Sequence, residues 1–320
     1  MKILAIQNRM GIGDTVIFLP FIKALYKKYN SPISLLVKES SKADQYLFQT
    51  NYIDKIIKLE RDDKINGRHN GFLGSYNLIN DLRKYKFDKI FIFNSSLRFN
   101  LIARLSKIPE IYQYPLFKKY EQHSTNVPKK FVKDVINVEI NEDPEIQIDN
   151  KTVQEVTQKF KIDKNELNIL LGIGGSGPTK RIPSKTFLEV IDKILKIKKS
   201  KFFLATGKNA EEQIILNEIL GSKFKNFCFP LDNFLIKETL PIIKNCDFSI
   251  CNDSSFSHLS AALGIKTITL MADTPLIYGN YNSKMFPIIP DGEITVGHDT
   301  LGKEKINPQK ILNKVIEILN

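Results

Sequence analysis

Short apolar runs alternate with helix-periodic segments along almost the whole chain, and this alternation restricts the fold more than any other feature. The first half contains runs of strand length at residues 2–6, 33–37, 55–59, 89–93 and 110–114. Apolar residues recur at helical spacing over residues 15–29 and 97–107. Strands that alternate with helices form parallel sheets with helices on both faces. The pattern therefore predicts an α/β fold.

The alternation starts again after a polar region at residues 116–150, where Pro128 and Pro144 favour loops around a helix at 130–137. Predicted strands follow at 168–173, 201–206, 226–229, 248–251 and 267–271. Predicted helices cover 152–160, 186–196, 211–220, 235–244 and 256–263. A last helix begins at Asn307 and Pro308, with Asn as N-cap and Pro at the first helical position.

Two Rossmann-like domains are the simplest architecture for this order of elements. We expect an N-terminal domain at residues 1–150, a second domain at 151–306, and a C-terminal helix at 307–320 that packs back toward the N-terminal domain. In such a pair, ligands are expected at the carboxyl ends of the strands, in the cleft between the domains.

The net charge of +12 favours partners that carry negative charge, such as a nucleotide, a phosphorylated lipid or a membrane surface. The abundance of Lys together with Ile and Asn explains the charge equally well as a matter of composition. No nucleic-acid-binding motif accompanies it, so a nucleic-acid partner is not expected. The three cysteines lack CxxC spacing and predict small buried residues in a reducing compartment. No signal peptide or membrane span is evident, so we expect a cytoplasmic protein.

A glycine-rich turn after the predicted strand at 168–173 is the strongest local signal. It reads GIGGSGPTKR, and its glycines allow the backbone to approach an anion closely. Ser176 and Thr179 add hydroxyl groups, and Lys180 and Arg181 add positive charge suited to a diphosphate. Arg181 stands where a Walker A loop has Ser or Thr, so the turn is not of that class. The alternative is a tight turn with a solvated Lys-Arg pair.

Two further strand ends carry polar residues. Asp253, Ser254 and Ser255 occupy the cap region of a predicted helix that includes His258, where free amides point outward. Taken alone, this segment favours an ordinary N-cap with a packed histidine. Glu211 lies just past another strand end, where a carboxylate can accept both hydroxyls of a ribose.

A second glycine-rich turn, IQNRMGIGDT, lies near the start of the chain. Gly11 and Gly13 begin a GxG pattern, but Val16 stands where a nicotinamide-binding fingerprint requires glycine, so that reading fails. Asp14 stands where a helix N-cap belongs, and Ile17 rules out a capping box.

The order and spacing of four motifs, IQNRMGIGD, GIGGSGPTKRIP, TGKNAEE and NDSSFSHLSAALGIKTITLMADTP, resemble glycosyltransferase family 9. This is the heptosyltransferase family of lipopolysaccharide core synthesis, with the GT-B fold of two Rossmann-like domains whose parallel sheets face a central cleft. The resemblance covers nearly the whole chain and includes FNSSLR at residues 93–98 and INP at 306–308.

The resemblance implies a role for individual residues. Asp14 matches the catalytic base. The donor-binding residues would be Ser176, Thr179, Lys180, Glu211, Asp253, Ser254, Ser255 and His258, with Glu212 as an alternative to Glu211. The acceptor-binding residues would be Gly13, Arg98, Arg61 and Lys64, although the loop around the last two is mixed in sign. The family usually has glycine where this chain has Ser255.

The resemblance implies an inverting glycosyltransferase that acts on a nucleotide-diphosphate sugar such as ADP-heptose and on an anionic glycolipid or glycan acceptor. No DxD motif and no metal-ligand spacing of histidines is present, so neither a metal nor another cofactor is expected. A non-catalytic nucleotide-sugar-binding protein and a nucleotide-sugar epimerase of the same fold are the alternatives. A lipid acceptor would bring a monomeric enzyme to the cytoplasmic face of the inner membrane, with Lys23, Lys27 and Lys28 near anionic headgroups. The alternative for these lysines is a solvated helix face.

Overall fold

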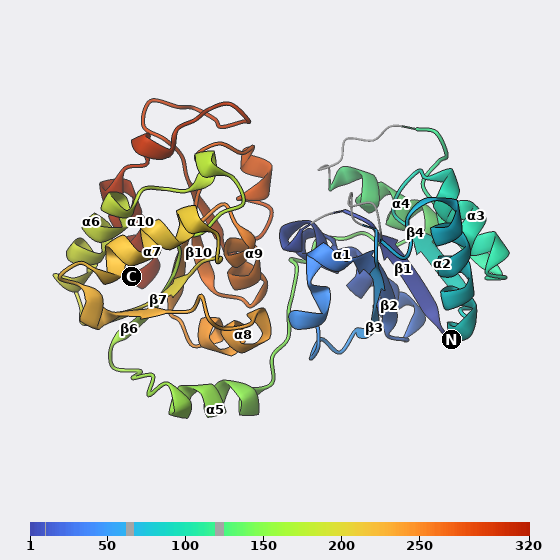
Figure 1. The fold of residues 1–320 in the computed structure, drawn as a ribbon, viewed down its shortest axis with the longest axis horizontal. Helices are drawn as coiled ribbons and strands as arrows, with labels where there is room; N and C mark the ends of the chain where they lie inside the picture. Colours follow the sequence, from blue (N-terminus) through green and yellow to red (C-terminus); the bar gives the residue numbers. More distant parts are fainter. Residues whose placement is uncertain (10, 62–66, 119–124) are drawn as a thin grey trace. The chain divides into compact units, whose positions relative to one another are not determined.

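The computed structural model of the protein describes residues 1–9, 11–61, 67–118 and 125–320 (Figure 1). The described chain separates into two compact units, Met1–Gln147 and Ile148–Asn320. Each unit contains one parallel sheet with helices on both faces. This architecture confirms the predicted α/β class with two Rossmann-like units, as in the GT-B fold.

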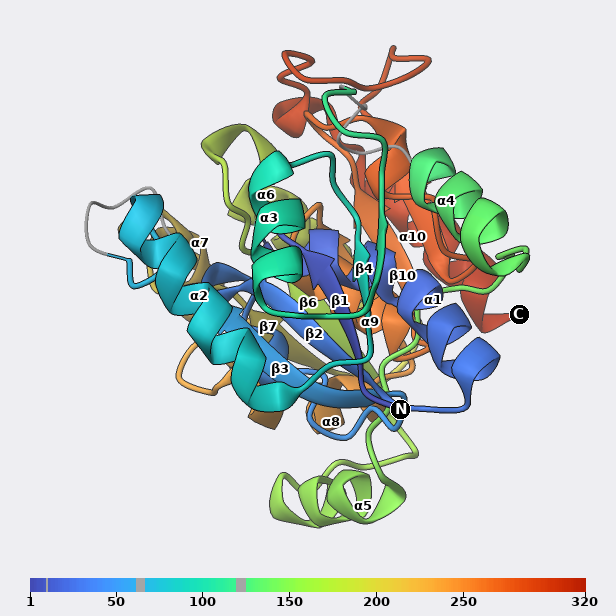
Figure 2. The same ribbon diagram turned by 90° about the vertical axis from the view of Figure 1, so that its right-hand side faces the viewer.

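The first unit is built on five parallel strands. They are β1 (Ile3–Gln7), β2 (Ile33–Lys38), β3 (Ile53–Leu59), β4 (Lys89–Ile92) and β5 (Glu110–Gln113), and their order in the sheet is β3-β2-β1-β4-β5. The helices are α1 (Ile12–Tyr29), α2 (Gly71–Tyr85), α3 (Leu97–Leu105) and α4 (Asn126–Ile136), with short 3-10 turns at Glu39–Ser41 and Ala43–Gln45. Helices α2 and α3 lie side by side on one face of the sheet, and α1 and α4 on the other (Figure 2).

The second unit is built on six parallel strands. They are β6 (Leu167–Gly172), β7 (Ser200–Ala205), β8 (Cys228–Pro230), β9 (Phe248–Asn252), β10 (Lys266–Leu270) and β11 (Met285–Ile288), in the order β11-β10-β9-β6-β7-β8. The helices are α5 (Asn150–Lys159), α6 (Ser184–Leu195), α7 (Ala210–Leu220), α8 (Ile236–Lys244), α9 (Ser255–Ala262) and α10 (Pro308–Leu319). Short 3-10 turns cover Pro178–Lys180, Lys225–Phe227, Leu276–Tyr278 and Lys303–Lys305.

The central strands of both sheets are buried throughout. Every residue of β1 and of β6 is buried, because helices cover both faces of a parallel sheet. The sequences of these central strands are accordingly mainly apolar. Helix α10 packs against α6 and places Ile311 and Val315 in the core of the second unit.

All ten predicted strands overlap observed strands, with ends that differ by at most two residues. Among the α-helices and strands of the described residues, two were not predicted. Helix α2 carries Gly71 and Gly74 in its first turn, which weakens its helical signal, and β11 is a four-residue edge strand with Pro287.

Each sheet has one point where the chain reverses its direction of growth. In the first unit the chain runs from β1 outward to β3 and returns to β4 on the other side of β1. In the second unit it runs from β6 outward to β8 and returns to β9. Open α/β sheets bind ligands outside the carboxyl ends of the strands at such switch points. We therefore expect the functional residues at these two positions.

Candidate active site

The glycine-rich loop follows β6 at the switch point of the second unit. A Cβ on Gly172 would come within 2.6 Å of the Cys251 sulfur, and a Cβ on Gly174 within 2.5 Å of a Glu212 carboxylate oxygen. Both glycines are therefore required for close packing of the loop against its neighbours. A Cβ on Gly175 would meet only ordinary contacts, the nearest at 3.6 Å.

The two adjacent glutamates of α7 have different environments. Glu212 is buried, and its Oε1 accepts a hydrogen bond of 2.7 Å from the Gly175 amide, while Asn209, the N-cap of α7, bonds the other oxygen. The carboxylate of Glu212 is thus committed to holding the glycine-rich loop. Glu211 is largely exposed and forms an ion pair with Arg181. Arg181 itself is buried and also donates to the Gly175 carbonyl at 2.8 Å, so it is part of the loop and not a solvated partner of Lys180.

An ion pair connects the ends of β6 and β9. The Lys180 Nζ donates to Asp253 Oδ2 at 2.9 Å, and Asp253 is almost fully buried. The side-chain amide of Asn252 donates to the carbonyls of Ile173 at 2.8 Å and Gly174 at 3.2 Å. The predicted donor residues Lys180 and Asp253 are therefore brought together although 73 positions separate them.

His258 is buried behind this ion pair. Its Nδ1 lies 2.7 Å from the Tyr281 hydroxyl, whose ring stacks on the imidazole, and its Nε2 lies 3.9 Å from Asp253 Oδ1, beyond hydrogen-bond distance. Burial lowers the pKa of His258 and outweighs the negative charge of Asp253, which acts to raise it. Burial acts to raise the pKa of Asp253, but the charges of Lys180 and His258 and a hydrogen bond from Lys180 outweigh it and hold that pKa low.

The first turn of α9 lies next to the same ion pair. Ser254 is its N-cap, and the Ser254 hydroxyl is buried without a hydrogen-bond partner in the part of the chain that the structure describes. Ser255 begins the helix with an ordinary negative φ, so its side chain causes no backbone strain. Helix N-termini offer unpaired amides and a positive dipole end to anions. With Lys180 alongside, this corner of the sheet can hold a phosphate group.

The remaining residues of the glycine-rich loop differ in their contacts. Ser176 is exposed, whereas the Thr179 hydroxyl bonds the carboxylate of Asp273. Asp273 also accepts a hydrogen bond of 2.7 Å from the Leu301 amide. Neither Asp273 nor Tyr281 was predicted as a site residue. Asp273 follows β10 in the motif that ends ADTP, and its place just past a strand end was the signal that could have found it.

Asp14 lies at the switch point of the first unit. Its position in the turn predicted that it would be the N-cap of α1, and this prediction is wrong. The N-cap is Gly11, whose φ of 99° favours glycine, and Asp14 is the third helical residue. The Asp14 carboxylate leans back over the helix terminus, since a Cβ on Gly11 would lie 3.4 Å from its Oδ2. A negative charge in the first turn is stabilised by the helix dipole. Gly13 is the second helical residue.

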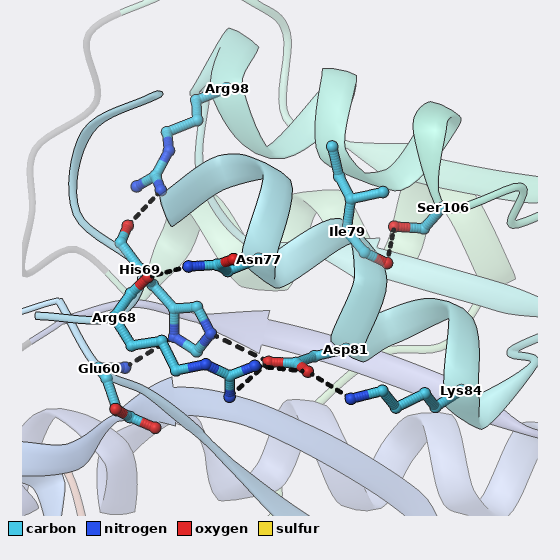
Figure 3. A network of polar contacts seen from close by, with 9 residues as sticks. All are labelled: Glu60, Arg68, His69, Asn77, Ile79, Asp81, Lys84, Arg98 and Ser106. Carbon is cyan, nitrogen blue, oxygen red and sulfur yellow. Dashed lines mark hydrogen bonds and ion pairs between the residues drawn. The ribbon is translucent and has the colours of Figure 1, made fainter. Parts of the chain in front are cut away.

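Arg98 lies beside the neighbouring strand end, in the first turn of α3. Its Nε donates to the Ser75 hydroxyl at 2.9 Å. One terminal nitrogen donates to the His69 carbonyl at 2.5 Å (Figure 3). The other terminal nitrogen is buried and finds no partner among the described residues. Burial and repulsion from Arg61 lower the pKa of Arg98. Two neighbouring guanidinium groups with a spare donor suit an anionic ligand. Lys64 lies outside the described residues.

A polar network holds the segment that Arg98 contacts (Figure 3). The Glu60 amide donates to His69 Nδ1 at 3.0 Å, so the ring proton is on Nε2, which donates to Asp81 at 3.3 Å. Arg68 and Lys84 also bond the Asp81 carboxylate. Burial acts to raise the pKa of Asp81, but these hydrogen bonds outweigh it and the pKa is lowered. No sequence motif indicated this network.

Lys23 and Lys27 on α1 have partners within the first unit. Lys23 lies 2.5 Å from a Glu145 oxygen and 3.3 Å from a Glu142 oxygen, and Lys27 also pairs with Glu142. These pairs reduce the positive charge that this helix can present to a membrane.

Two features are absent from the part of the chain that the structure describes. None of the helices combines the length and apolar character needed to span a membrane. No group of three or more His, Cys, Asp or Glu side chains is arranged to hold a metal ion.

The chain is similar to known proteins over most of its length. The model of glycosyltransferase family 9 (heptosyltransferase) matches residues 76–289. The lipopolysaccharide heptosyltransferase 1 of Campylobacter coli is 24% identical over 92% of this chain and 90% of its own length. A glycosyltransferase family 9 structure from Veillonella parvula has a TM-score of 0.81 at 18% identity, covering 99% of this chain and 97% of that one. The E. coli ADP-heptose lipopolysaccharide heptosyltransferase II has a TM-score of 0.75 at 17% identity, covering 100% and 98%.

Proposed function

Since the chain belongs to glycosyltransferase family 9, we propose that it transfers a heptose or a similar sugar, with inversion, from a nucleotide-diphosphate donor to a lipopolysaccharide core or related glycan acceptor. It is a glycosyltransferase by its family. The names of its relatives support ADP-heptose as the donor and a lipopolysaccharide as the acceptor.

The observation that carries the proposal is the Lys180–Asp253 pair beside the first turn of α9. The donor diphosphate would bind there, with Ser176 and the Ser254 hydroxyl as further contacts and Thr179 beside them in the loop, its hydroxyl held by Asp273. As the bond from the anomeric carbon to the diphosphate breaks, negative charge accumulates on the leaving group. Lys180 and the α9 amides stabilise that charge more than the ground state, which lowers the barrier. Glu211, whose carboxylate is exposed, would accept the ribose hydroxyls, because that of Glu212 is occupied.

Asp14 is the proposed base of the first unit. It removes the proton from an acceptor hydroxyl as that oxygen attacks the anomeric carbon, and the diphosphate leaves with the bonding electrons. General-base catalysis of this kind contributes about 10²–10⁴-fold to the rate. Gly13 leaves room for the acceptor next to Asp14. Arg98 and Arg61, with Lys64, would bind the anionic groups of the acceptor.

We propose that neither a metal ion nor another cofactor takes part in the transfer. We propose a monomer that meets its lipid-linked acceptor at the cytoplasmic face of the inner membrane.

A two-part experiment tests the function. Thermal unfolding with ADP, UDP and GDP, each with its sugar, should show the largest stabilisation with the ADP series, because a ligand bound by the folded state raises the midpoint by mass action. Transfer from ADP-heptose to a purified core acceptor should then occur equally with and without a metal chelator. Hydrolysis without transfer, or loss of transfer with the chelator, would contradict the respective part of the proposal.

A further inference from the structure

Helices α2 and α3 expose an unusual number of large apolar side chains. On α2, Phe72 and Leu73 are 92% and 78% exposed, and Tyr76 follows one turn after Phe72. On α3, Leu97, Leu101 and Leu105 recur every four residues and are all exposed. A spacing of four places side chains on one face of a helix, so each helix presents an apolar stripe to solvent. These six residues are called the α2–α3 surface.

The two stripes are neighbours. The helices lie side by side in the first unit (Figure 2). Arg98, between Leu97 and Leu101 in sequence, donates to the hydroxyl of Ser75, the residue directly before Tyr76, at 2.9 Å. This hydrogen bond joins the N-terminal parts of α2 and α3. Monomeric proteins rarely expose large contiguous apolar patches without a binding role.

The two helices that form this surface carry more positive than negative charge. Arg61, Arg68 and Arg98 lie at the end of the surface where both helices begin, and α3 contains no acidic residue. The single acidic residue of α2, Asp81, already accepts hydrogen bonds from Arg68 and Lys84. Apolar side chains next to arginines match the two layers of an anionic bilayer surface, its acyl boundary and its phosphates.

We propose that the α2–α3 surface docks on an anionic lipid bilayer. The aromatic and leucine side chains enter the acyl boundary, and the net positive charge of the two helices attracts the anionic lipid headgroups. A second copy of the chain would fit less well, since an isologous contact would bring the same arginines together. The proposal rests on the proposed function in one respect, which is that the acceptor is held in a membrane.

Co-sedimentation of the full chain with vesicles tests this surface. The vesicles contain phosphatidylcholine alone or mixed with phosphatidylglycerol. The test variant is Phe72→Ser with Leu73→Ser, and the matched control is Ile214→Ser with Ile294→Ser, which removes exposed apolar side chains from the second unit. Thermal unfolding of each variant confirms that it folds.

The parent and the control should bind phosphatidylglycerol vesicles more strongly than neutral ones, and the test variant should lose about tenfold or more of this binding. Equal binding by parent and test variant would overturn the proposal, as would equal loss in the control or indifference to lipid charge. Concentration-dependent dimerisation that disappears in the test variant would also overturn it, since a second copy would then cover the surface. The readout needs no sugar transfer, so an inactive Asp14→Asn variant should bind vesicles like the parent, and failure of the proposed function leaves the test intact.

Discussion

The ammonium of Lys180 lies 2.9 Å from the carboxylate of Asp253, and this contact joins the glycine-rich loop after β6 to the residue before the Ser254 cap of α9. Asp253 is almost fully buried while Lys180 is partly exposed. The carboxylate therefore holds the ammonium at the start of a helix, where its positive charge adds to that of the helix terminus. Both partners lie at the switch point of the second sheet.

Replacement of Asp253 by asparagine should make the stability of the protein less dependent on pH in the acid range. The folded protein holds the pKa of Asp253 below its ordinary value, so its contribution is present above the unfolded pKa of about 3.9 and is lost as the pH falls through the folded pKa. We expect Asp253→Asn to be less stable at pH 7, by about 1–3 kcal/mol, and to lose less stability than the parent between neutral and acid pH. Urea unfolding over a pH series measures this. Parallel stability curves for the two proteins would contradict it.

Replacement of Asp14 by asparagine should abolish most of the transfer without disturbing the fold. Asparagine cannot take the acceptor proton, so kcat should fall about 10²–10⁴-fold while the KM for the donor stays nearly constant. Loss of a first-turn charge should cost only about 0.3–1 kcal/mol of stability. Steady-state kinetics with the donor and acceptor varied separately checks this, with thermal unfolding as the control for folding. Near-parental kcat would remove Asp14 from the mechanism.

Substitutions of the adjacent residues Glu211 and Glu212 should have different effects, the first on donor binding and the second on the stability of the glycine-rich loop. Glu212→Ala leaves the buried Gly175 amide without its acceptor, which should cost about 1–3 kcal/mol. Glu211→Gln changes an exposed carboxylate, so stability should change by less than about 1 kcal/mol while the KM for the donor rises several-fold. Chemical unfolding and donor titrations measure both. The reverse pattern would assign the ribose contact to Glu212.

Much of the candidate site follows from the order of strands. The carboxyl ends of neighbouring parallel strands share one edge of a sheet, so Lys180 after β6 and Asp253 after β9 could be expected together once both strands were predicted. The different environments of Glu211 and Glu212 could not, because the packing of Gly174 and the Asn209 cap decide which carboxylate turns inward.

Local backbone freedom limited the prediction of where α1 begins. Gly11 adopts a positive φ, and this lets the helix begin three residues earlier than the predicted start at residue 15. Asp14 consequently lies within the first turn instead of before it. The His69–Asp81 contact was also beyond prediction, because it connects a loop to a helix through side chains that no motif links.

Asp81 should influence binding of the acceptor through Arg98. Its carboxylate holds the His69 ring, and the His69 carbonyl accepts a hydrogen bond from Arg98, so the change Asp81→Asn weakens the support of the guanidinium without removing it (Figure 3). We expect a loss of about 1–3 kcal/mol of stability and a several-fold rise in the KM for an anionic acceptor, with an unchanged KM for the donor.

The matched control for Asp81 is Asp44→Asn, which breaks an exposed pair with Lys58 and should cost no more than about 1 kcal/mol. Arg98→Lys keeps the charge but loses the planar fork that reaches Ser75 and His69 together, so its KM for the acceptor should rise at least as much as that of Asp81→Asn. Kinetics with the acceptor and an uncharged analogue decides whether the effect is electrostatic. If Asp81→Asn alters stability alone, the network supports the fold and does not position Arg98. An equal rise in KM for the charged and uncharged acceptors would show that Arg98 does not bind the anionic group.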